Sequence, residues 1–280
     1  MIEVILVSTG SLQEYIVDNI KHLTGLGYKK ITVITEKEYF PKLSECQVNL
    51  VGSRSLNLDG RFDTNNNPAM KDPWKYLQHV ASKRLFLLYK YLKNNNKTNC
   101  IHIENDTLLY NKFTKSDFNS EKVYITMDNG NRCIPGFIYI PSWKLLDDLI
   151  NNWGKGNDMQ NVAGYFKRNR SIVEPLPIIK PNLNYNFDDH KDPNYRIVYK
   201  NHALFNGIFD AAAIGQYLGG THRGRGNDIG FVNETCLVKY NCYDFIWKQH
   251  APYIIIDNQE VPIYNLHIHS KNLKKFINEK

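Results

Sequence analysis

The chain has 280 residues, of which 42% are hydrophobic and 22% charged, and its formal net charge is +7. This length fits two small domains or one large α/β domain, and the composition excludes a disordered polymer. No apolar run approaches the roughly 18 residues that span a bilayer, and residues 4–7 lack the basic flank and cleavage site of a signal peptide. The positive charge favours an anionic partner.

Five scattered cysteines form no CxxC pair, so neither a zinc ribbon nor a disulfide framework is indicated. We therefore expect a cytoplasmic protein in a reducing compartment. Asn, Lys and Ile are used heavily, which is typical of an AT-rich genome, bacterial or from a large DNA virus. For a viral protein the expected location is the host cytoplasm.

The first hundred residues alternate between strand-like and helix-like patterns. Ser11 and Glu14 form a capping box that predicts the start of a helix, and a second helix is predicted over residues 74–92. Short apolar runs, typical of buried parallel strands, lie at residues 4–7, 31–34, 48–51 and 100–103. This rhythm predicts an α/β fold with an open sheet, in which ligands bind beyond the carboxyl ends of the strands.

The second half is more mixed. Strands are predicted at residues 123–127, 138–140 and 264–269, and Ser142 is expected to cap a helix. The alanines and glycines of residues 211–220 predict a helix packed closely on the sheet. Two long loops are expected, at residues 53–73 and 219–230, the second rich in arginine and glycine. No linker divides the chain, so a single domain over residues 1–280 is predicted.

Two acids, Glu104 and Asp106, follow the apolar strand at residues 100–103. Residues i and i+2 of a strand point to the same side, so these carboxylates are expected to project together from the carboxyl edge of the sheet. Paired carboxylates there suit a hard divalent cation, Mn²⁺ or Mg²⁺. The alternative is a solvated strand end with two surface acids.

A strand that ends in acid-x-acid, after a helix with a basic residue, resembles the DxD motif of GT-A-fold nucleotide-sugar glycosyltransferases. The motif here is the variant Glu104-Asn105-Asp106. The resemblance implies an open mixed sheet flanked by helices, with a nucleotide-binding half over residues 1–106 and an acceptor half over residues 107–280. It implies that Asp106 ligates a metal that bridges the donor's two phosphates, with Glu104 beside the metal or the ribose.

The resemblance also places other residues of the first half near the donor. Arg84, on the helix before the acid motif, would face the nucleotide or diphosphate, and an arginine can pair with phosphate bidentately. An ordinary exposed basic residue is the alternative. Ser8, Thr9 and Gly10 follow the first strand, so they are expected to line the nucleotide pocket at the carboxyl edge of the sheet.

The tail alternates apolar and polar residues. Asn265, His267, His269 and Lys271 are predicted to share the face of a strand opposite the core. The resemblance assigns His267 or His269 to the metal, without choosing between them, and Lys271 to phosphate. Imidazole ligation suits Mn²⁺ better than Mg²⁺. The alternative is a solvated basic edge strand.

Three further residues are candidates on the acceptor side. Gly136 resembles the family's glycine beside the donor sugar and would let a ligand approach the backbone. Asp158 retains the first acid of an acid-Gln-acid helix start found in some retaining enzymes, although Met159 and Gln160 depart from that pattern; a helix N-cap is the alternative. Asp210 is a candidate sugar-binding or catalytic acid.

The leading hypothesis is a metal-dependent glycosyltransferase that moves a sugar from a UDP- or GDP-sugar to a hydroxyl of a glycan or glycoprotein. A nucleotidyltransferase of similar fold, or a nucleic-acid- or glycan-binding protein without catalysis, is the alternative. No zinc-finger or RNP-like spacing favours nucleic acid, and there is no P-loop. The sugar, the acceptor, the stereochemical course and the oligomeric state are not determined by the sequence.

Overall fold

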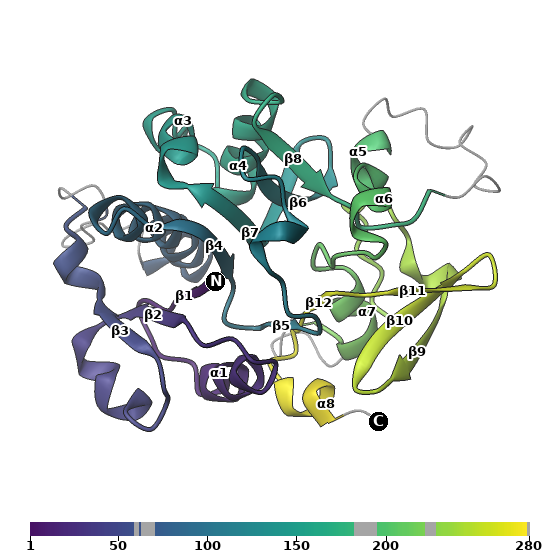
Figure 1. The fold of residues 1–280 in the computed structure, drawn as a ribbon, viewed down its shortest axis with the longest axis horizontal. Helices are drawn as coiled ribbons and strands as arrows, with labels where there is room; N and C mark the ends of the chain where they lie inside the picture. The colour runs from purple at the N-terminus through teal and green to yellow at the C-terminus, as the bar shows by residue number, and fades with distance from the viewer. Residues whose placement is uncertain (59–61, 63–70, 182–194, 222–227, 279–280) are drawn as a thin grey trace.

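A seven-stranded mixed sheet with helices on both faces organises the protein (Figure 1). The computed structural model describes residues 1–58, 62, 71–181, 195–221 and 228–278. The sheet order is β3-β2-β1-β4-β7-β6-β8. Its strands are β1 (Glu3–Val7), β2 (Ile31–Thr35), β3 (Asn49–Gly52), β4 (Thr98–Ile103), β6 (Val123–Asn129), β7 (Arg132–Ser142) and β8 (Val173–Leu176). The predicted α/β class is confirmed.

The first four strands of this order run parallel, so their carboxyl ends meet at one edge. β7 is antiparallel to both β4 and β6, and β8 is parallel to β6. The helices are α1 (Tyr15–Gly25), α2 (Pro73–Asn94), α3 (Asp147–Asn151), α4 (Asp158–Arg168), α5 (Tyr195–Tyr199), α6 (His202–Phe205), α7 (Ile214–Gly219) and α8 (Leu273–Asn278). Short 3₁₀ turns lie at Lys37–Leu43, Ser53–Leu56, Lys115–Asp117, Trp143–Leu146 and Tyr240–Cys242.

Alternation along β1 distributes its side chains between two cores. Ile5 and Val7 join a cluster with Leu85 and Leu88 of α2, whereas Val4 and Leu6 join a cluster with residues of α1. Because both faces of the strand are covered by helices, its residues 4–7 form the continuous apolar run seen in the sequence. The strand predictions in the first half are thereby confirmed.

Two smaller sheets belong to the second half. β12 (Asn265–His267) pairs antiparallel with β5 (Thr107–Leu109), directly beyond the acid motif. β9 (Asp244–Lys248), β10 (Ala251–Ile256) and β11 (Gln259–Pro262) form an antiparallel meander. Leu266 and Ile268 are fully buried in a third core cluster with residues of this meander. The apolar residues of the tail are therefore part of the core.

One of the two helix starts predicted in the first half differs from the sequence prediction. α1 begins at Tyr15, because the hydroxyl of Ser8 donates to Gln13 Oε1 (3.1 Å) and to the carbonyl of Ser11 (3.4 Å), which holds this stretch as a loop. The expected capping box at Ser11 is wrong, and Glu14 makes no side-chain cap. α2 begins as predicted, with Asp72 accepting from the amides of two residues in its first turn.

The alanines of residues 211–213 are buried but not helical, contrary to the prediction. Ala212 has a φ of +54°, and the helix starts only at Ile214. The central parts of both predicted long loops, residues 59–61, 63–70 and 222–227, lie outside the described residues. No helix within the described parts of the chain is long and apolar enough to cross a membrane.

Candidate metal and diphosphate site

The acid motif forms a tight turn at the carboxyl end of β4. The strand ends at Ile103, and the amide of Thr107 donates to the carbonyl of Glu104 (3.0 Å). The amide of Glu104 in turn donates to the carbonyl of Gly136 on β7 (3.1 Å). Glu104 and Asp106 thus converge through a turn, and not through the shared strand face that the sequence predicted.

His267 meets both acids because β12 pairs with β5. In this register His267 lies opposite Thr107, the residue after Asp106. Its Nε2 atom lies 3.1 Å from Glu104 Oε2 and 3.3 Å from Asp106 Oδ1. One ligand atom from each of the three residues lies within 4.8 Å of the other two. Two carboxylate oxygens and an imidazole nitrogen at this spacing fit a divalent cation such as Mn²⁺.

His269 lies outside this group of three ligand atoms. Its ring centroid is 4.6 Å from that of His267, and its Nδ1 atom lies 3.0 Å from Gln216 Nε2 of α7. The strand ends at His267, so the predicted alternation stops before His269. The alternative of a solvated edge strand is wrong, because Asn265 and His267 are both buried.

Two permanent cations border the acids. Lys271 forms an ion pair with Asp106, and Arg84 forms one with Glu104. Arg84 Nη2 also lies 3.4 Å from Asp158 Oδ2, so one guanidinium joins carboxylates from β4's end and from the start of α4. The alternative that Arg84 is an ordinary exposed basic residue is therefore wrong, since its side chain is only 14% exposed.

The charges in the cluster shift one another's titration. Burial alone would raise the pKa of Glu104, but Arg84 and His267 outweigh it and lower that pKa to about 2. Burial is likewise outweighed at Asp106, where His267 and Lys271 hold the pKa well below its usual range. At His267 the two acids outweigh burial and raise the pKa to about 10. Without a metal, a proton on His267 balances the acids; a bound divalent cation would replace that proton.

Gly136 leaves room for the imidazole. A Cβ on this residue would lie 3.0 Å from His267 Nδ1 and 3.3 Å from Thr107 Oγ1. Both of these buried atoms lack a hydrogen-bond partner among the residues that the structure describes. Gly136 therefore borders the candidate metal ligand, and its place beside a donor sugar stays a prediction.

The loop after β1 lies at the same edge of the sheet. Gly10 has a φ of +85°, and its amide donates to Glu36 Oε1 at 3.2 Å. Glu36 follows β2 and was not singled out in the sequence, because a lone acid after a strand carries no pattern. Within the described part of the chain, Thr9 Oγ1 and Glu36 Oε2 are buried without a hydrogen-bond partner.

Asp158 and Asp210, the two predicted catalytic acids, have different surroundings. Asp158 is the first residue of α4, whose N-cap is Asn157, and burial raises its pKa although Arg84 opposes this shift. The carboxylate of Asp210 is fully occupied by four backbone amides, those of Ala213, Ile214, Gly215 and His267. Asp158 thus borders the acid cluster through Arg84, whereas Asp210 contacts the backbone behind His267.

Asn19 of α1 is a residue that the sequence reading missed. Its Nδ2 atom donates to the carbonyl of Asn105 (2.9 Å) and to that of Thr107 (3.0 Å), so it holds the backbone on both sides of Asp106. Asn19 is fully buried. A single polar residue on an apolar helix face was the available signal, but nothing in the sequence shows which backbone it contacts.

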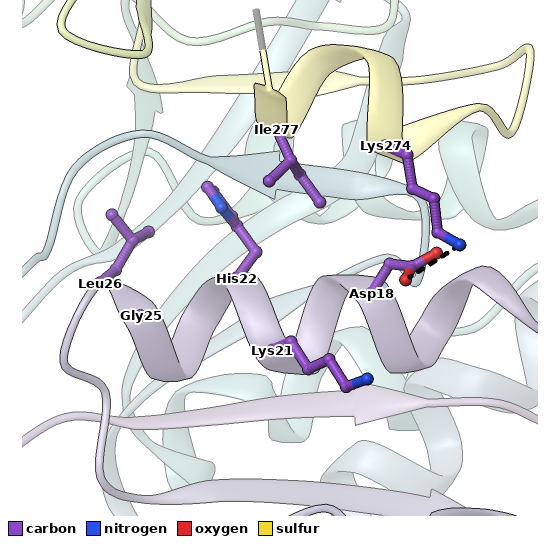
Figure 2. A pocket seen from close by; sticks show the side chains of 7 residues that line it. All are labelled: Asp18, Lys21, His22, Gly25, Leu26, Lys274 and Ile277. Atoms are coloured by element: carbon purple, nitrogen blue, oxygen red, sulfur yellow. Dashed lines mark ion pairs between the residues drawn. The ribbon is translucent and has the colours of Figure 1, made fainter.

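A separate groove lies between α1 and α8 (Figure 2). Lys274 of α8 spans it toward Asp18 of α1, with Nζ 3.9 Å from Oδ1. The remaining lining residues are Lys21, His22, Gly25, Leu26 and Ile277. The groove marks where α8, which begins two residues after Lys271, rests on α1.

No family model matches the sequence, and no curated protein is similar to it at a significant level. Among solved structures, the PaToxG glycosyltransferase shares 13% identity, covers 59% of this chain and 68% of its own, and has a TM-score of 0.37. An inositol-1-phosphate CTP transferase from T. maritima shares 11% identity over 62% of this chain and 84% of its own, with a TM-score of 0.35. A cytidylyltransferase from Leptospira borgpetersenii shares 10% identity over 62% and 76%, with a TM-score of 0.36.

Proposed function

We propose that this protein is a metal-dependent glycosyltransferase that uses a UDP- or GDP-sugar as donor and a hydroxyl of a glycan or glycoprotein as acceptor. The observation that carries the proposal is the convergence of Glu104, Asp106 and His267 beside Lys271 and Arg84. Three adjacent ligand atoms and two cations at the carboxyl edge of a sheet suit a metal-bound diphosphate.

Charge balance supports this assignment. Glu104, Asp106 and Asp158 contribute three negative charges, and Arg84 and Lys271 contribute two positive ones. A divalent cation with neutral His267 would leave the site at net +1, ready for a nucleoside diphosphate. When bound, the metal supplies neutralisation of the charge that develops on the leaving diphosphate.

The chain's own residues then have separate roles in the proposal. Glu104, Asp106 and His267 hold the metal, and Lys271 leaves Asp106 to pair with a donor phosphate. Such a charge-assisted contact strengthens as negative charge accumulates on the leaving group. His269 is held aside by Gln216 and does not ligate in this proposal.

Nucleotide and sugar are proposed to occupy opposite sides of the metal. Ser8, Thr9 and Gly10 line the nucleotide side, where Thr9 and Glu36 offer unpaired oxygens. Arg84 faces the diphosphate, Asp158 faces the donor sugar, and Gly136 permits close approach of that sugar. In this proposal residues 1–106 form the nucleotide half and residues 107–280 the acceptor half of one cytoplasmic domain.

The decisive test measures turnover of a panel of nucleotide sugars and, in parallel, of nucleoside triphosphates with sugar phosphates, each with and without Mn²⁺. A glycosyltransferase releases a nucleoside diphosphate and a free or transferred sugar. A nucleotidyltransferase, which would use the same kind of metal site, instead releases pyrophosphate from a nucleoside triphosphate and a sugar phosphate. Pyrophosphate release without nucleoside diphosphate release would replace the proposal with this alternative, and no turnover of either kind would leave a binding protein.

A further inference from the structure

The carboxylate of Asp210 lies behind the metal site and not in it. Its Oδ1 atom accepts from the amides of Ala213 (2.8 Å) and Ile214 (2.9 Å), and its Oδ2 atom accepts from Gly215 (2.8 Å). The second oxygen also accepts from the amide of His267 at 2.9 Å. Asp210 is 1% exposed, so four protein amides and no solvent surround its charge.

These four bonds connect two elements that the sequence keeps far apart. Three come from the turn that opens α7, and the fourth comes from the last residue of β12. The side chain of Asn265 strengthens the junction, because its Oδ1 accepts from the amide of Asp210 at 3.1 Å. His267 is thus fixed through its backbone amide, in addition to the contacts that its imidazole makes with the acids.

Gly215 shows how closely the two elements approach. A Cβ on this residue would lie 2.2 Å from the carbonyl oxygen of His267 and 2.9 Å from Asp210 Oδ2. Only a glycine permits this contact without displacement of β12. The start of α7 therefore fixes the position of the His267 backbone.

We propose that Asp210 is a positioning residue for the metal site, which acts by fixing the backbone of His267 against α7. The inference rests on the proposed metal site, and it replaces the catalytic role that the sequence suggested for Asp210. Partners one step behind a metal ligand set its orientation, and their loss costs about 10–100-fold in metal affinity. The fully occupied carboxylate has no acceptor capacity left to remove a proton from an acceptor hydroxyl.

The test compares Asp210→Asn with Glu3→Gln. Glu3 is also a buried carboxylate with several hydrogen bonds, but it lies at the opposite end of β1, away from the site. We expect both variants to unfold at lower temperature than the wild type. Only Asp210→Asn should lose Mn²⁺ affinity, by about 10–100-fold in calorimetry of the full-length protein.

Metal rescue separates positioning from catalysis. If Asp210 positions His267, raising the Mn²⁺ concentration should restore most of the turnover of Asp210→Asn, because the metal site fills again. If Asp210 touches the reacting atoms, turnover stays low at saturating Mn²⁺. Equal Mn²⁺ affinity in Asp210→Asn and wild type, or equal losses in both variants, overturns the proposal; absence of Mn²⁺ binding by the wild type overturns the metal site itself.

A measurement on the unmodified protein covers the case in which Asp210→Asn does not fold. Because coupling between sites is reciprocal, Mn²⁺ should slow amide hydrogen exchange at His267 and in residues 213–215 together. Exchange in α3, which follows the end of β7 opposite Thr98 at the other edge of the sheet, serves as the internal reference. Protection that rises at His267 but not in residues 213–215 would contradict the proposed coupling.

Discussion

The two halves of the candidate metal site differ in how much of the fold each requires. Glu104 and Asp106 flank one residue at the end of β4, so a few neighbouring residues place them. Lys271 lies 165 residues from Asp106, and His267 reaches the acids only because β12 pairs with β5. A local half presents the negative charge, and a distant half, held from behind by Asp210, completes the ligand set.

The strongest challenge to the local half is Asp106→Ala. Loss of one metal carboxylate should remove several kcal/mol of transition-state stabilisation, which is a fall of at least about a hundredfold in Mn²⁺-dependent turnover. Asp148→Ala is the matched control, because Asp148 is a surface acid paired with Arg168 at 3.0 Å. Steady-state kinetics with circular dichroism check the prediction; full turnover in Asp106→Ala shows that the acids do not hold the metal.

The distant half is tested by comparing His267→Ala with His269→Ala. We expect His267→Ala to lower Mn²⁺ affinity by more than the roughly 10–100-fold of an outer partner, and His269→Ala to change it about threefold at most. Calorimetry measures both. Point variants are preferred to truncation of the tail, because Leu266, Ile268 and Phe276 are buried in the core. A larger loss in His269→Ala would reverse the ligand assignment.

Lys271→Ala tests whether the distant half also binds phosphate. One charge-assisted contact contributes roughly 1.5–3 kcal/mol, so affinity for UDP or GDP with Mn²⁺ should fall about 10–150-fold. Lys274→Ala is the control, since this lysine points to Asp18 across the groove between α1 and α8 (Figure 2). Similar losses in the two variants would mean that general positive charge, and not a specific contact, attracts the nucleotide.

A smaller effect on Mn²⁺ affinity is expected from a substitution at Gly136, which borders His267 in the distant half of the metal site. In Gly136→Ala the new methyl group would lie 3.0 Å from His267 Nδ1, so the imidazole must shift by a few tenths of an ångström. We expect Mn²⁺ affinity to fall about tenfold, at the lower end of outer-partner effects. Thermal unfolding should change little, because no core packing is removed. An unchanged Mn²⁺ affinity would show that the space left by Gly136 does not constrain the position of the His267 imidazole.

The same division explains what the sequence could predict. Continuous apolar runs predicted β1 and β4 because both faces of these strands are buried, and the acids after β4 were found from position alone. The tail was less predictable, because its alternation predicts one strand that continues to Lys271 with its polar residues on the face opposite the core. β12 has only three residues, and Asn265 and His267 are buried because β5 and α7 cover them.

Polar residues that act at a distance were the least predictable. Asn19 and Asp210 each bond backbone groups of other elements, so their roles depend on which segments the fold brings together. Asp210 stands out in the sequence as a polar residue among small ones, which suggests a catalytic acid. The sequence does not show that four backbone amides already donate to its carboxylate. The polar residue type thus indicates that each side chain has a role, but the sequence does not identify the backbone groups that it bonds.

The smallest effect on the metal site is expected for Glu3→Gln. This variant tests whether the free energy of unfolding can fall while Mn²⁺ affinity stays unchanged, because Glu3 lies at the end of β1 away from the site. Burial raises the pKa of Glu3, but hydrogen bonds from Lys97, Thr32 and Tyr91 outweigh it and leave the pKa below its usual 4.5. Since the folded-state pKa is the lower one, ionised Glu3 stabilises the fold above about pH 4.5, and this stabilisation is lost as the pH falls through the folded-state value.

The substitution should therefore cost roughly 1–3 kcal/mol near neutral pH, through donors left without a charged acceptor. It should also flatten the acid limb of stability against pH. Urea unfolding at pH values from about 7 down to about 3 measures both effects, and Mn²⁺ affinity should stay at the wild-type value. An unchanged acid limb would show that Glu3 is not the group that titrates. A loss of Mn²⁺ affinity would instead show that the two ends of β1 are coupled, and that the halves of the site depend on the whole sheet.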